Sequence, residues 1–243
     1  MGLALTKGRF CARLTTHLGD IAAAQALRHE SFHGHGGLDC DGFDARCLHL
    51  MVEERGTGRL MACCRIMPVN AGRIDESYSA QYYELSELKI FEGVMLEVGR
   101  FCTLPGVADP DILRISWALL TRYVDENNVE MLFGCSSFAG TDATLYRDTF
   151  AMLNARHLAP KRWSPRVKAA EIVRFGNCPA RAMDVKQALL RMPPLLRTYL
   201  AMGGWVSDHA VVDEDMGTLH VFTGLEVAAI PPSRKRLLRV VAA

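Results

Sequence analysis

The positions of apolar and polar residues along this chain predict alternating strands and helices. Residues 94–104 form a run of apolar, β-branched and aromatic side chains that ends at Pro105-Gly106, which is typical of a buried strand. Residues 129–138 contain a single charge and predict a second buried strand. Between the two, apolar residues recur at helical spacing over 111–127, with a proline in the first turn. This order favours a mixed α/β fold.

The other elements follow from the same patterns. The remaining predicted strands are residues 8–14, 48–53, 60–67, 205–212 and 218–227, with the turn Gly56-Thr57-Gly58 between the second and third. The remaining predicted helices are residues 21–32 after the cap Asp20, about 142–157, and about 183–202 with a break at Pro193-Pro194. Residues 77–88 fit either a helix or an irregular strand. Since no repeat or low-complexity linker divides the chain, we expect one domain over 1–243, with a core of about 8–157 and a basic and helical extension with a strand pair of about 158–243.

Composition narrows the class of protein only a little. Hydrophobic residues make up 49% of the chain and charged ones 23%, which is a globular balance, and the net charge of +1 does not indicate nucleic acid as a partner. The eight cysteines are scattered and no secretory signal precedes them, so we expect a reduced, cytoplasmic chain. No apolar run approaches the roughly 20 residues needed to span a bilayer, so we expect any membrane contact to be peripheral. Nothing in the pattern indicates an oligomeric state.

Two opposite charges lie inside the buried run of residues 94–104. Glu97 and Arg100 are three positions apart, so in a regular strand their side chains face opposite sides of the sheet. Gly99, between them, is a candidate for a bulge or a close backbone approach. A charge on each face costs stability that a purely structural strand would keep, which marks this strand as the floor of a candidate active site. The alternative is a central strand whose charges are paired with neighbours.

The order of elements resembles the GNAT acyltransferase fold, whose central mixed sheet splays apart between its fourth and fifth strands, here residues 94–104 and 129–138. A more specific resemblance rests on Arg28 with Phe32, on Asp39, Asp41 and Asp44, on Arg65 and on Glu97-Val98-Gly99-Arg100-Phe101. Together these residues resemble the acyl-homoserine-lactone synthases. Residues 37–41, 131–138 and 193–200 make the chain more similar still to the ornithine N-alpha-acyltransferases of ornithine-lipid synthesis. The resemblance covers nearly the whole chain.

The resemblance implies a reaction and its partners. A long, 3-hydroxylated acyl group would pass from the thioester of an acyl carrier protein to the α-amino group of L-ornithine, giving lyso-ornithine lipid. The thioester is a substrate, so no metal or tightly held cofactor is expected. A homoserine-lactone synthase is the first alternative, but that family needs S-adenosylmethionine and carries N-terminal tryptophans, whereas the first tryptophan here is Trp117. The others are an acetyl-CoA-dependent acetyltransferase and a non-catalytic module that binds lipid surfaces or carrier protein.

The loop after the strand at 94–104 bears on the acyl donor. Most acetyl-CoA enzymes of this fold place a glycine-rich loop there, whose backbone amides hold the pyrophosphate. Residues 104–110 contain one glycine and are followed by Asp111, so a pyrophosphate would meet a poorer cradle. A carrier protein presents a single phosphate, which favours it as the donor.

The resemblance also suggests roles for the site residues. Glu97 is the candidate general base, although it is equally consistent with a structural partner of Arg100 or Arg65. The arginines suit the carboxylate of ornithine and the aspartates suit its side-chain ammonium; the alternative is that they pair with one another and order the loop. The candidate acyl and pantetheine channel comprises Phe101, Cys102, Thr103, Cys135, Ser136, Ser137 and Phe138, with oxyanion donors expected from the backbone at 101–103. Cys102 and Cys135 are more typical of small buried hydrophobes than of nucleophiles.

Basic residues gather between positions 156 and 174. We expect this basic block to dock the acidic surface of a carrier protein, with contact to anionic lipid or a solvated face as the alternatives. Its docking candidates are Arg156, Lys161, Arg162, Arg166 and Lys168. Residues 189–205 mix apolar and cationic side chains and suit either the core, an acyl chain or a membrane surface. The histidines and cysteines between His29 and His49, His35 among them, match no standard zinc spacing, so no metal is expected.

Overall fold

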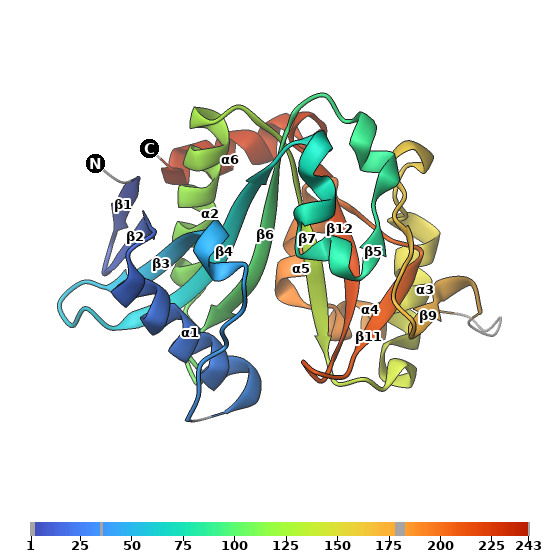
Figure 1. The fold of residues 1–243 in the computed structure, drawn as a ribbon, viewed down its shortest axis with the longest axis horizontal. Helices are drawn as coiled ribbons and strands as arrows, with labels where there is room; N and C mark the ends of the chain where they lie inside the picture. The colour runs from blue at the N-terminus through green and yellow to red at the C-terminus, as the bar shows by residue number, and fades with distance from the viewer. Residues whose placement is uncertain (1–2, 35, 178–182, 243) are drawn as a thin grey trace. The chain divides into compact units, whose positions relative to one another are not determined.

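The computed structural model describes residues 3–34, 36–177 and 183–242, which gather into two compact units (Figure 1). Unit 1 combines Met1–Pro68, Leu96–Val129 and Pro232–Ala243, and unit 2 combines Val69–Met95 and Glu130–Pro231. Both units contain strands and helices, which confirms the mixed α/β class. Across the described ranges, the helices are too short or too polar to cross a membrane.

Unit 1 is built on a sheet whose strand order is β1-β2-β3-β4-β6. The strands are β1 (Ala4–Lys7), β2 (Phe10–Thr15), β3 (Leu48–Glu54), β4 (Leu60–Val69) and β6 (Val94–Thr103). The first four pair antiparallel with their neighbours in turn. The sequence predicts a single first strand over 8–14, but Gly8 has a positive φ of 56° and makes a turn there, so β1 and β2 form a hairpin instead.

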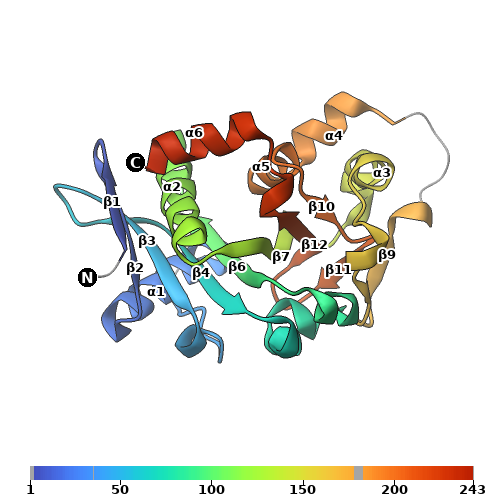
Figure 2. The same ribbon diagram turned by 90° about the horizontal axis from the view of Figure 1, so that it is seen from above.

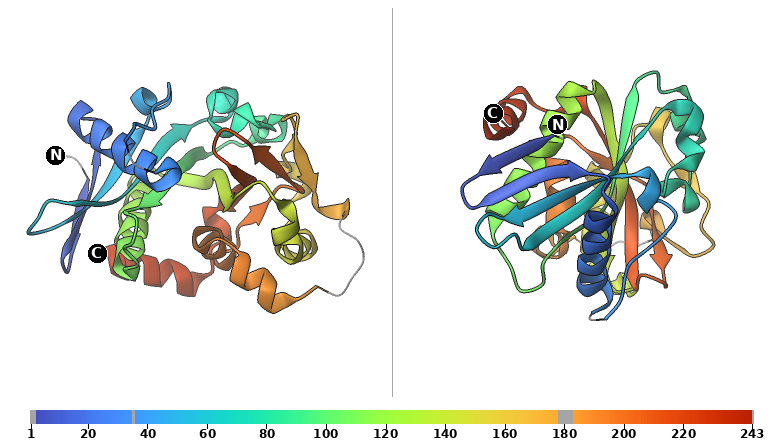
Figure 3. Two further views of the ribbon diagram at one scale, coloured as in Figure 1. Left: turned by 90° about the horizontal axis from the view of Figure 1, so that it is seen from below. Right: turned by 60° about the vertical axis from the view of Figure 1, so that its left-hand side comes forward.

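Two helices cover the opposite faces of this sheet, α1 (Leu18–His33) and α2 (Pro110–Glu126), as Figures 2 and 3 show. The apolar stripe of α2 is buried against the sheet, and Asp109 caps the helix by accepting the amide of Asp111 at 2.9 Å. A third helix, α6 (Pro232–Ala242), lies against α2. The sequence indicates only that the end of the chain is basic, not that it is helical.

The cap predicted for α1 is wrong. His17, not Asp20, occupies the capping position, and its ring accepts the amide of Gly19 at 3.2 Å. Asp20 instead accepts two hydrogen bonds from Arg13 on β2, at 2.6 and 2.8 Å. An arginine on the neighbouring strand therefore competes successfully for the carboxylate that the local pattern assigns to the helix end. The predicted stop at Gly34 is confirmed, with φ at 92°.

Unit 2 is built on a second run of antiparallel strands, β7 (Val129–Ala139), β12 (Thr218–Glu226), β11 (His209–Asp213) and β9 (Ile172–Arg174), in that order. β10 (Trp205–Val206) also pairs with β12, and β5 (Tyr83–Glu84) pairs with β8 (Arg166–Val167). The predicted strand at 205–212 is thus interrupted, because Ser207 donates its hydroxyl to the carbonyl of His209 at 2.7 Å.

The helices of unit 2 cover one face of its strands (Figure 2), and they are α3 (Arg147–Arg156), α4 (Val185–Arg191) and α5 (Pro194–Ala201). Their core includes Phe138, Phe150, Leu196 and Val221. Residues 71–90 cover the other face, where the hydroxyl of Tyr83 donates to the carbonyl of His220 at 2.9 Å. Short 3-10 helices occur at Asp44–Arg46, Ala71–Glu76, Ser79–Gln81, Ser86–Ile90, Ala143–Tyr146, Lys161–Trp163, Phe175–Asn177 and Val227–Ala229.

Residues 77–88 are therefore neither one helix nor one strand but short 3-10 turns around β5, and the helix predicted from Asp142 begins as a 3-10 turn. The break at Pro193-Pro194 is confirmed between α4 and α5. The predicted splay between β6 and β7 and the single domain over 1–243 stay predictions.

Candidate active site

An arginine–aspartate network joins α1, the loop of residues 36–47, β4 and β6 within unit 1. Its six members are Arg28 on α1, Asp39, Asp41 and Asp44 in the loop, Arg65 on β4 and Arg100 on β6. All six are predicted from the sequence as substrate-binding or catalytic residues. The structure brings them together, and each arginine pairs with two of the aspartates.

Arg28 is the most deeply buried member, with its side chain 1% exposed. Its Nε lies 2.8 Å from Oδ2 of Asp39, its Nη1 lies 2.9 Å from Oδ1 of Asp44, and its Nη2 donates to Oδ2 of Asp44 at 2.9 Å. A buried guanidinium is tolerated only where carboxylates neutralise it. Arg28 therefore holds the loop onto α1 and leaves almost no surface for a substrate.

Arg65 and Arg100 bind the same loop from the two strands. Arg65 donates to Asp41 and, through Nη1 at 3.1 Å, to Oδ1 of Asp44. Arg100 donates from Nε to Oδ2 of Asp39 at 3.0 Å, and its Nη2 lies 3.7 Å from Oδ2 of Asp41. From the sequence, the alternative to substrate binding is that the arginines and aspartates pair with one another and order the loop. All three arginines have the contacts that this alternative predicts.

One edge of the network remains accessible. The side chain of Asp41 is 27% exposed and that of Arg100 is 13% exposed, while the other four members are at most 9% exposed. A solute that meets this network therefore meets a carboxylate and a guanidinium side by side. That pair complements a molecule with one cationic and one anionic group.

The charges of the network set the ionisation of its carboxyls. Burial alone would raise the pKa of Asp44, but hydrogen bonds from Arg28 and Gln25 and the nearby positive charges outweigh it, and the pKa lies well below its usual range. Burial also opposes ionisation of Asp41, yet the hydrogen bond and charge of Arg65 lower its pKa. Both aspartates are ionised at neutral pH, as neutralisation of the arginines requires.

His49 on β3 supports the network from below. Its Nε2 donates to the carbonyl of Asp44 at 3.0 Å, and it lies opposite Arg65 in the β3–β4 register. Burial, aided by the charges of Arg28 and Arg65, lowers the pKa of His49, so its ring is neutral in the folded chain. Sequence reasoning missed Gln25 and His49. A uniform count outward from Thr57 also pairs residue 49 with residue 65, but in the structure Glu53 pairs with Leu60 and a register shift between Val52 and Glu53 brings His49 opposite Arg65.

Stability should therefore fall as the pH is lowered through the range in which free histidine titrates. The pKa of His49 is lower in the folded chain than in the unfolded one, so neutral His49 contributes its full share of the free energy of unfolding above about pH 6.5. Below that pH the free energy of unfolding falls by up to about 1.4 kcal/mol per pH unit for this one proton. Urea unfolding at pH 5 to 8 measures this loss. Burial also lowers the pKa of His157, so this residue contributes to the loss of stability over the same pH range. The variant His49→Gln is therefore the matched comparison.

In His49→Gln the decline between about pH 6.5 and 5 should shrink to the part due to other groups. A second decline, below about pH 3.9, should persist in both proteins because the lowered pKa values of Asp41 and Asp44 cause it. Identical pH profiles for the parent and His49→Gln above pH 5 would contradict the role given to His49.

The centre of β6 departs from a regular strand at Arg100. This residue has φ at 53°, in the left-handed region that non-glycine residues rarely adopt and that is enriched at functional sites. Gly99 does not have a positive φ, and a β-carbon there would meet no atom within 4 Å. The irregularity predicted at Gly99 thus falls one residue later. The regular alternation of side chains, from which the opposite-face expectation for Glu97 and Arg100 is derived, is interrupted at Arg100, and that expectation stays a prediction. Glu97 is buried, at 5% exposure.

The end of β6 is tied to α1. The hydroxyl of Ser31 donates to the carbonyl of Thr103 at 3.0 Å, a contact that the sequence does not signal. Cys102 is buried, and its sulfur lies 3.6 Å from that of Cys63 on β4. Phe32 and Phe101 are half-buried in the same unit. Phe32, Phe101, Cys102 and Thr103 therefore all belong to unit 1 with the network, and their roles toward an acyl donor stay predictions.

The channel residues predicted on β7 belong to unit 2 and differ in their surroundings. Cys135 is half-buried and its sulfur donates to Oγ of Ser79 at 3.6 Å, and Ser136 accepts a hydrogen bond from Thr223 at 2.9 Å. Ser137 is exposed, whereas the ring of Phe138 is 1% exposed and packs among the core residues under α3. The channel assignment on β7 stays a prediction, and Phe138 is first of all a core residue.

The basic block is exposed, but its cations are largely occupied within unit 2. Arg162 donates to Glu226 at 3.2 Å, Arg166 pairs with Glu87, and Nζ of Lys168 donates to the carbonyl of Ala80 at 2.6 Å. The other two docking candidates, at positions 156 and 161, are also exposed. Within the described ranges the cysteines, histidines and acids form no group of three placed to hold a metal ion, and His35 lies outside those ranges.

Comparisons with known proteins agree with this fold. The sequence profile of the acetyltransferase (GNAT) domain matches residues 24–118, which include all six network members. The solved structure of an N-acyl amino acid synthase from uncultured soil microbes superposes with a TM-score of 0.52 at 11% identity, over 91% of this chain and 94% of that chain. This likeness concerns the fold alone. Residues 24–118 thus match a GNAT acetyltransferase domain, and the solved structure has a similar fold.

Curated relatives identify the family. The chain is 31% identical to an L-ornithine N(alpha)-acyltransferase of Rhodobacter capsulatus over 235 residues, covering 90% of each chain. It is 29% identical to the protein of the same name in Brucella abortus, over 92% of this chain and 86% of that relative. This chain belongs to the family of L-ornithine N(alpha)-acyltransferases, which confirms the resemblance stated from its residues.

Proposed function

We propose that this chain transfers a long, 3-hydroxylated acyl group from acyl carrier protein to the α-amino group of L-ornithine and so forms lyso-ornithine lipid. The observation that carries the proposal is the family relationship, since relatives that align along about nine-tenths of this chain are named for the acylation of ornithine. The reaction takes place in the cytoplasm, with peripheral contact to the inner membrane. The thioester is a substrate, and the reaction needs no further cofactor.

The accessible edge of the network supports an amino acid as the acceptor. Ornithine carries a carboxylate and a side-chain ammonium, and Arg100 and Asp41 present the complementary charges. The buried members act indirectly, because Arg28, Asp44 and Arg65 fix the loop that carries Asp41. In this proposal Arg100 binds the carboxylate and Asp41 the ammonium, and the rest of the network holds them at a fixed separation.

The chemical step is a direct aminolysis of the thioester. The α-amino group has a pKa of about 8, so a base must remove its proton before or during attack. Glu97 is the proposed base. The amine nitrogen bonds to the thioester carbonyl carbon, the carbon–sulfur bond breaks, and the proton taken by Glu97 passes to the departing thiolate. Backbone amides at 101–103 are the proposed donors to the oxyanion.

The proposal predicts one product above others. Purified protein incubated with acyl carrier protein thioesters and a set of free amino acids should give N-acyl ornithine, read by mass spectrometry. Ornithine and lysine differ by one methylene in the side chain. A preference for ornithine therefore tests whether the protein binds the side-chain ammonium at a fixed distance from the carboxylate. One methylene corresponds to a change of about 10- to 200-fold in specificity. The matching coenzyme A thioesters, and chains without the 3-hydroxyl group, should react more slowly.

Formation of an amide with lysine or homoserine, and none with ornithine, would refute the acceptor assignment. Equal rates with coenzyme A thioesters would refute only the donor assignment. The arms of the assay therefore separate the two parts of the proposal.

A further inference from the structure

Helix α6 carries a concentration of positive charge that the candidate active site does not use. Its sequence, residues 232–242, has four cationic side chains and no acid. Arg239 forms a bidentate pair with Asp125 of α2, at 2.9 Å for both contacts. In the described part of the chain, Arg234, Lys235 and Arg236 have no acidic partner within salt-bridge distance. This differs from the basic block, where Glu226 and Glu87 already neutralise two of the cations.

The same helix exposes apolar side chains between its cations. Leu237 is 59% exposed and Val240 is 68% exposed. Being three residues apart, they lie on one face of the helix, one turn apart. Since Arg239 points to α2 and Lys235 is half-buried, the face with Leu237 and Val240 is turned away from α2. The result is a basic helix with an apolar ridge on its exposed side.

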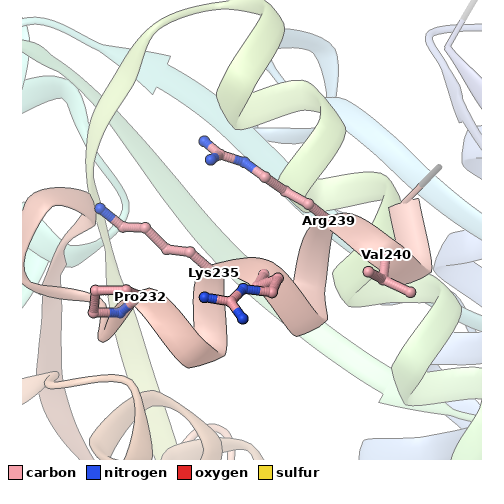
Figure 4. Close-up of a pocket in the computed structure, with 5 residues that line it drawn as sticks. Pro232, Lys235, Arg239 and Val240 are labelled. Atoms are coloured by element: carbon pink, nitrogen blue, oxygen red, sulfur yellow. The ribbon is translucent and has the colours of Figure 1, made fainter.

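The side chains of α6 also line an open hollow of about 500 Å³. Figure 4 shows Lys235 and Arg239 extending from the helix in the same direction, with Pro232 and Val240 beside them. Arg236 completes the lining. Of the three cations in this lining, Arg239 is paired with Asp125, which leaves Lys235 and Arg236 beside the apolar side chains of Pro232 and Val240. Cations next to apolar side chains suit an anionic group whose body is apolar, which is the chemistry of an anionic lipid at a membrane surface.

The position of α6 along α2 distinguishes a lipid surface from a carrier protein. The pair between Arg239 and Asp125 fixes α6 at the carboxyl end of α2. Asp125 is 15 residues from Pro110, so this end is about 22 Å along the helix from the loop at 104–110. That loop is where the resemblance implies the phosphate of the donor. A carrier protein that presents its phosphate at the loop would have its docking surface there, and not at the opposite end of α2.

We infer that α6 is a membrane-docking helix, which binds anionic phospholipid through Arg234, Lys235 and Arg236 and inserts Leu237 and Val240 among the lipids. This deepens the peripheral membrane contact of the proposed function by naming its surface. The choice of a lipid over a carrier protein rests on the proposed function, which places the phosphate of the donor at the loop of residues 104–110, and the rest of the inference rests on the geometry and charge of α6.

The test uses the full chain and vesicles. Co-sedimentation should show binding to phosphatidylcholine vesicles in which about a third of the lipid is phosphatidylglycerol, because these vesicles have an anionic surface. Vesicles of phosphatidylcholine alone should bind little protein. Salt should weaken the binding, because the Debye length falls from about 10 Å at 0.1 M to about 3 Å at 1 M. The triple variant Arg234→Gln, Lys235→Gln, Arg236→Gln should bind about 100-fold more weakly, since each cation near an anionic surface contributes about fivefold.

Two further variants make the result specific. Leu237→Gln with Val240→Thr should weaken vesicle binding about tenfold and leave its salt dependence unchanged, because it removes only the apolar contribution. The matched control, Arg156→Gln, Lys161→Gln, Arg162→Gln, removes the same charge from the basic block and should bind vesicles as the parent does. Loss of binding in this control with none in the α6 triple variant would overturn the proposal.

The same variants separate this inference from the proposed function. Amide formation in solution without vesicles should be unchanged in the α6 variants, because none of these residues belongs to the network. Absence of amide formation in the parent would refute the proposed function. The vesicle experiment would still test whether α6 binds anionic lipid. Vesicle binding that does not depend on phosphatidylglycerol would contradict the proposal. If the parent binds isolated carrier protein and the α6 triple variant does not, the partner of α6 is the carrier protein and not a lipid.

Discussion

Replacing Glu97 by glutamine is expected to lower the turnover of amide formation by about 10²- to 10⁴-fold, the usual contribution of a general base. Glutamine keeps the shape of the buried side chain but cannot accept the proton of the ornithine ammonium. The loss should be in kcat, because the proton is removed on the way to the transition state and not on binding. Steady-state kinetics with acyl carrier protein thioester and ornithine measure it.

A pH series separates a base from a structural partner. In the parent, turnover should rise with pH as Glu97 and the amine lose their protons, and the limb due to Glu97 should be absent from Glu97→Gln. Glu126→Gln, at the exposed end of α2, is the matched control and should retain full activity. A Glu97→Gln protein that unfolds at lower urea concentration, yet turns over normally at every pH, would show that Glu97 serves the fold and not the chemistry.

Replacing Asp44 by alanine is expected to lower the free energy of unfolding by about 3–5 kcal/mol, the usual cost of leaving a buried charge without its partner. Asp44 is contacted by Arg28, Arg65 and Gln25. Its removal leaves Arg28, whose side chain is 1% exposed, with Asp39 as its one remaining carboxylate among the network members, so that two carboxylates face three arginines. Urea unfolding measures the loss.

The matched control for this substitution is Asp125→Ala. Asp125 also makes a bidentate contact with an arginine, Arg239, but the two side chains are 41% and 60% exposed. Exposed pairs contribute about 0–1 kcal/mol, so this variant should unfold close to the parent. Similar losses in both variants would mean that burial is not what makes the network strong, and would contradict the account of Asp44.

The members of the network could be named from the sequence, but their pairing could not. Asp39, Asp41 and Asp44 lie in a loop with no periodicity, so no pattern indicates which carboxylate meets Arg28, Arg65 or Arg100. Such pairing depends on where the loop folds back on α1 and the strands, which is a tertiary property. All three arginines pair with the aspartates, but Arg28 is enclosed at 1% exposure whereas Arg100 is 13% exposed, a difference that the sequence does not indicate.

Local rules failed where a distant partner changed the outcome. Asp20 has the right identity and position for a helix cap, and Arg13 from the neighbouring strand binds it instead. Arg100 follows a glycine that suggests an irregular strand, but the left-handed residue is Arg100 itself. Its guanidinium is held by Asp39, and a contact of this kind can stabilise a backbone angle that no sequence rule would assign to arginine.

The sharing of Asp44 between two arginines limits how this protein can change over generations. A substitution of Arg28 alone frees one carboxylate contact but leaves Asp44 bound to Arg65, so its cost depends on what stands at position 65. Each step through a single replacement passes through a chain with an uncompensated buried charge. Descendants that alter this loop must therefore change several of its positions nearly together, and sequences that keep five members of the network are expected to keep the sixth.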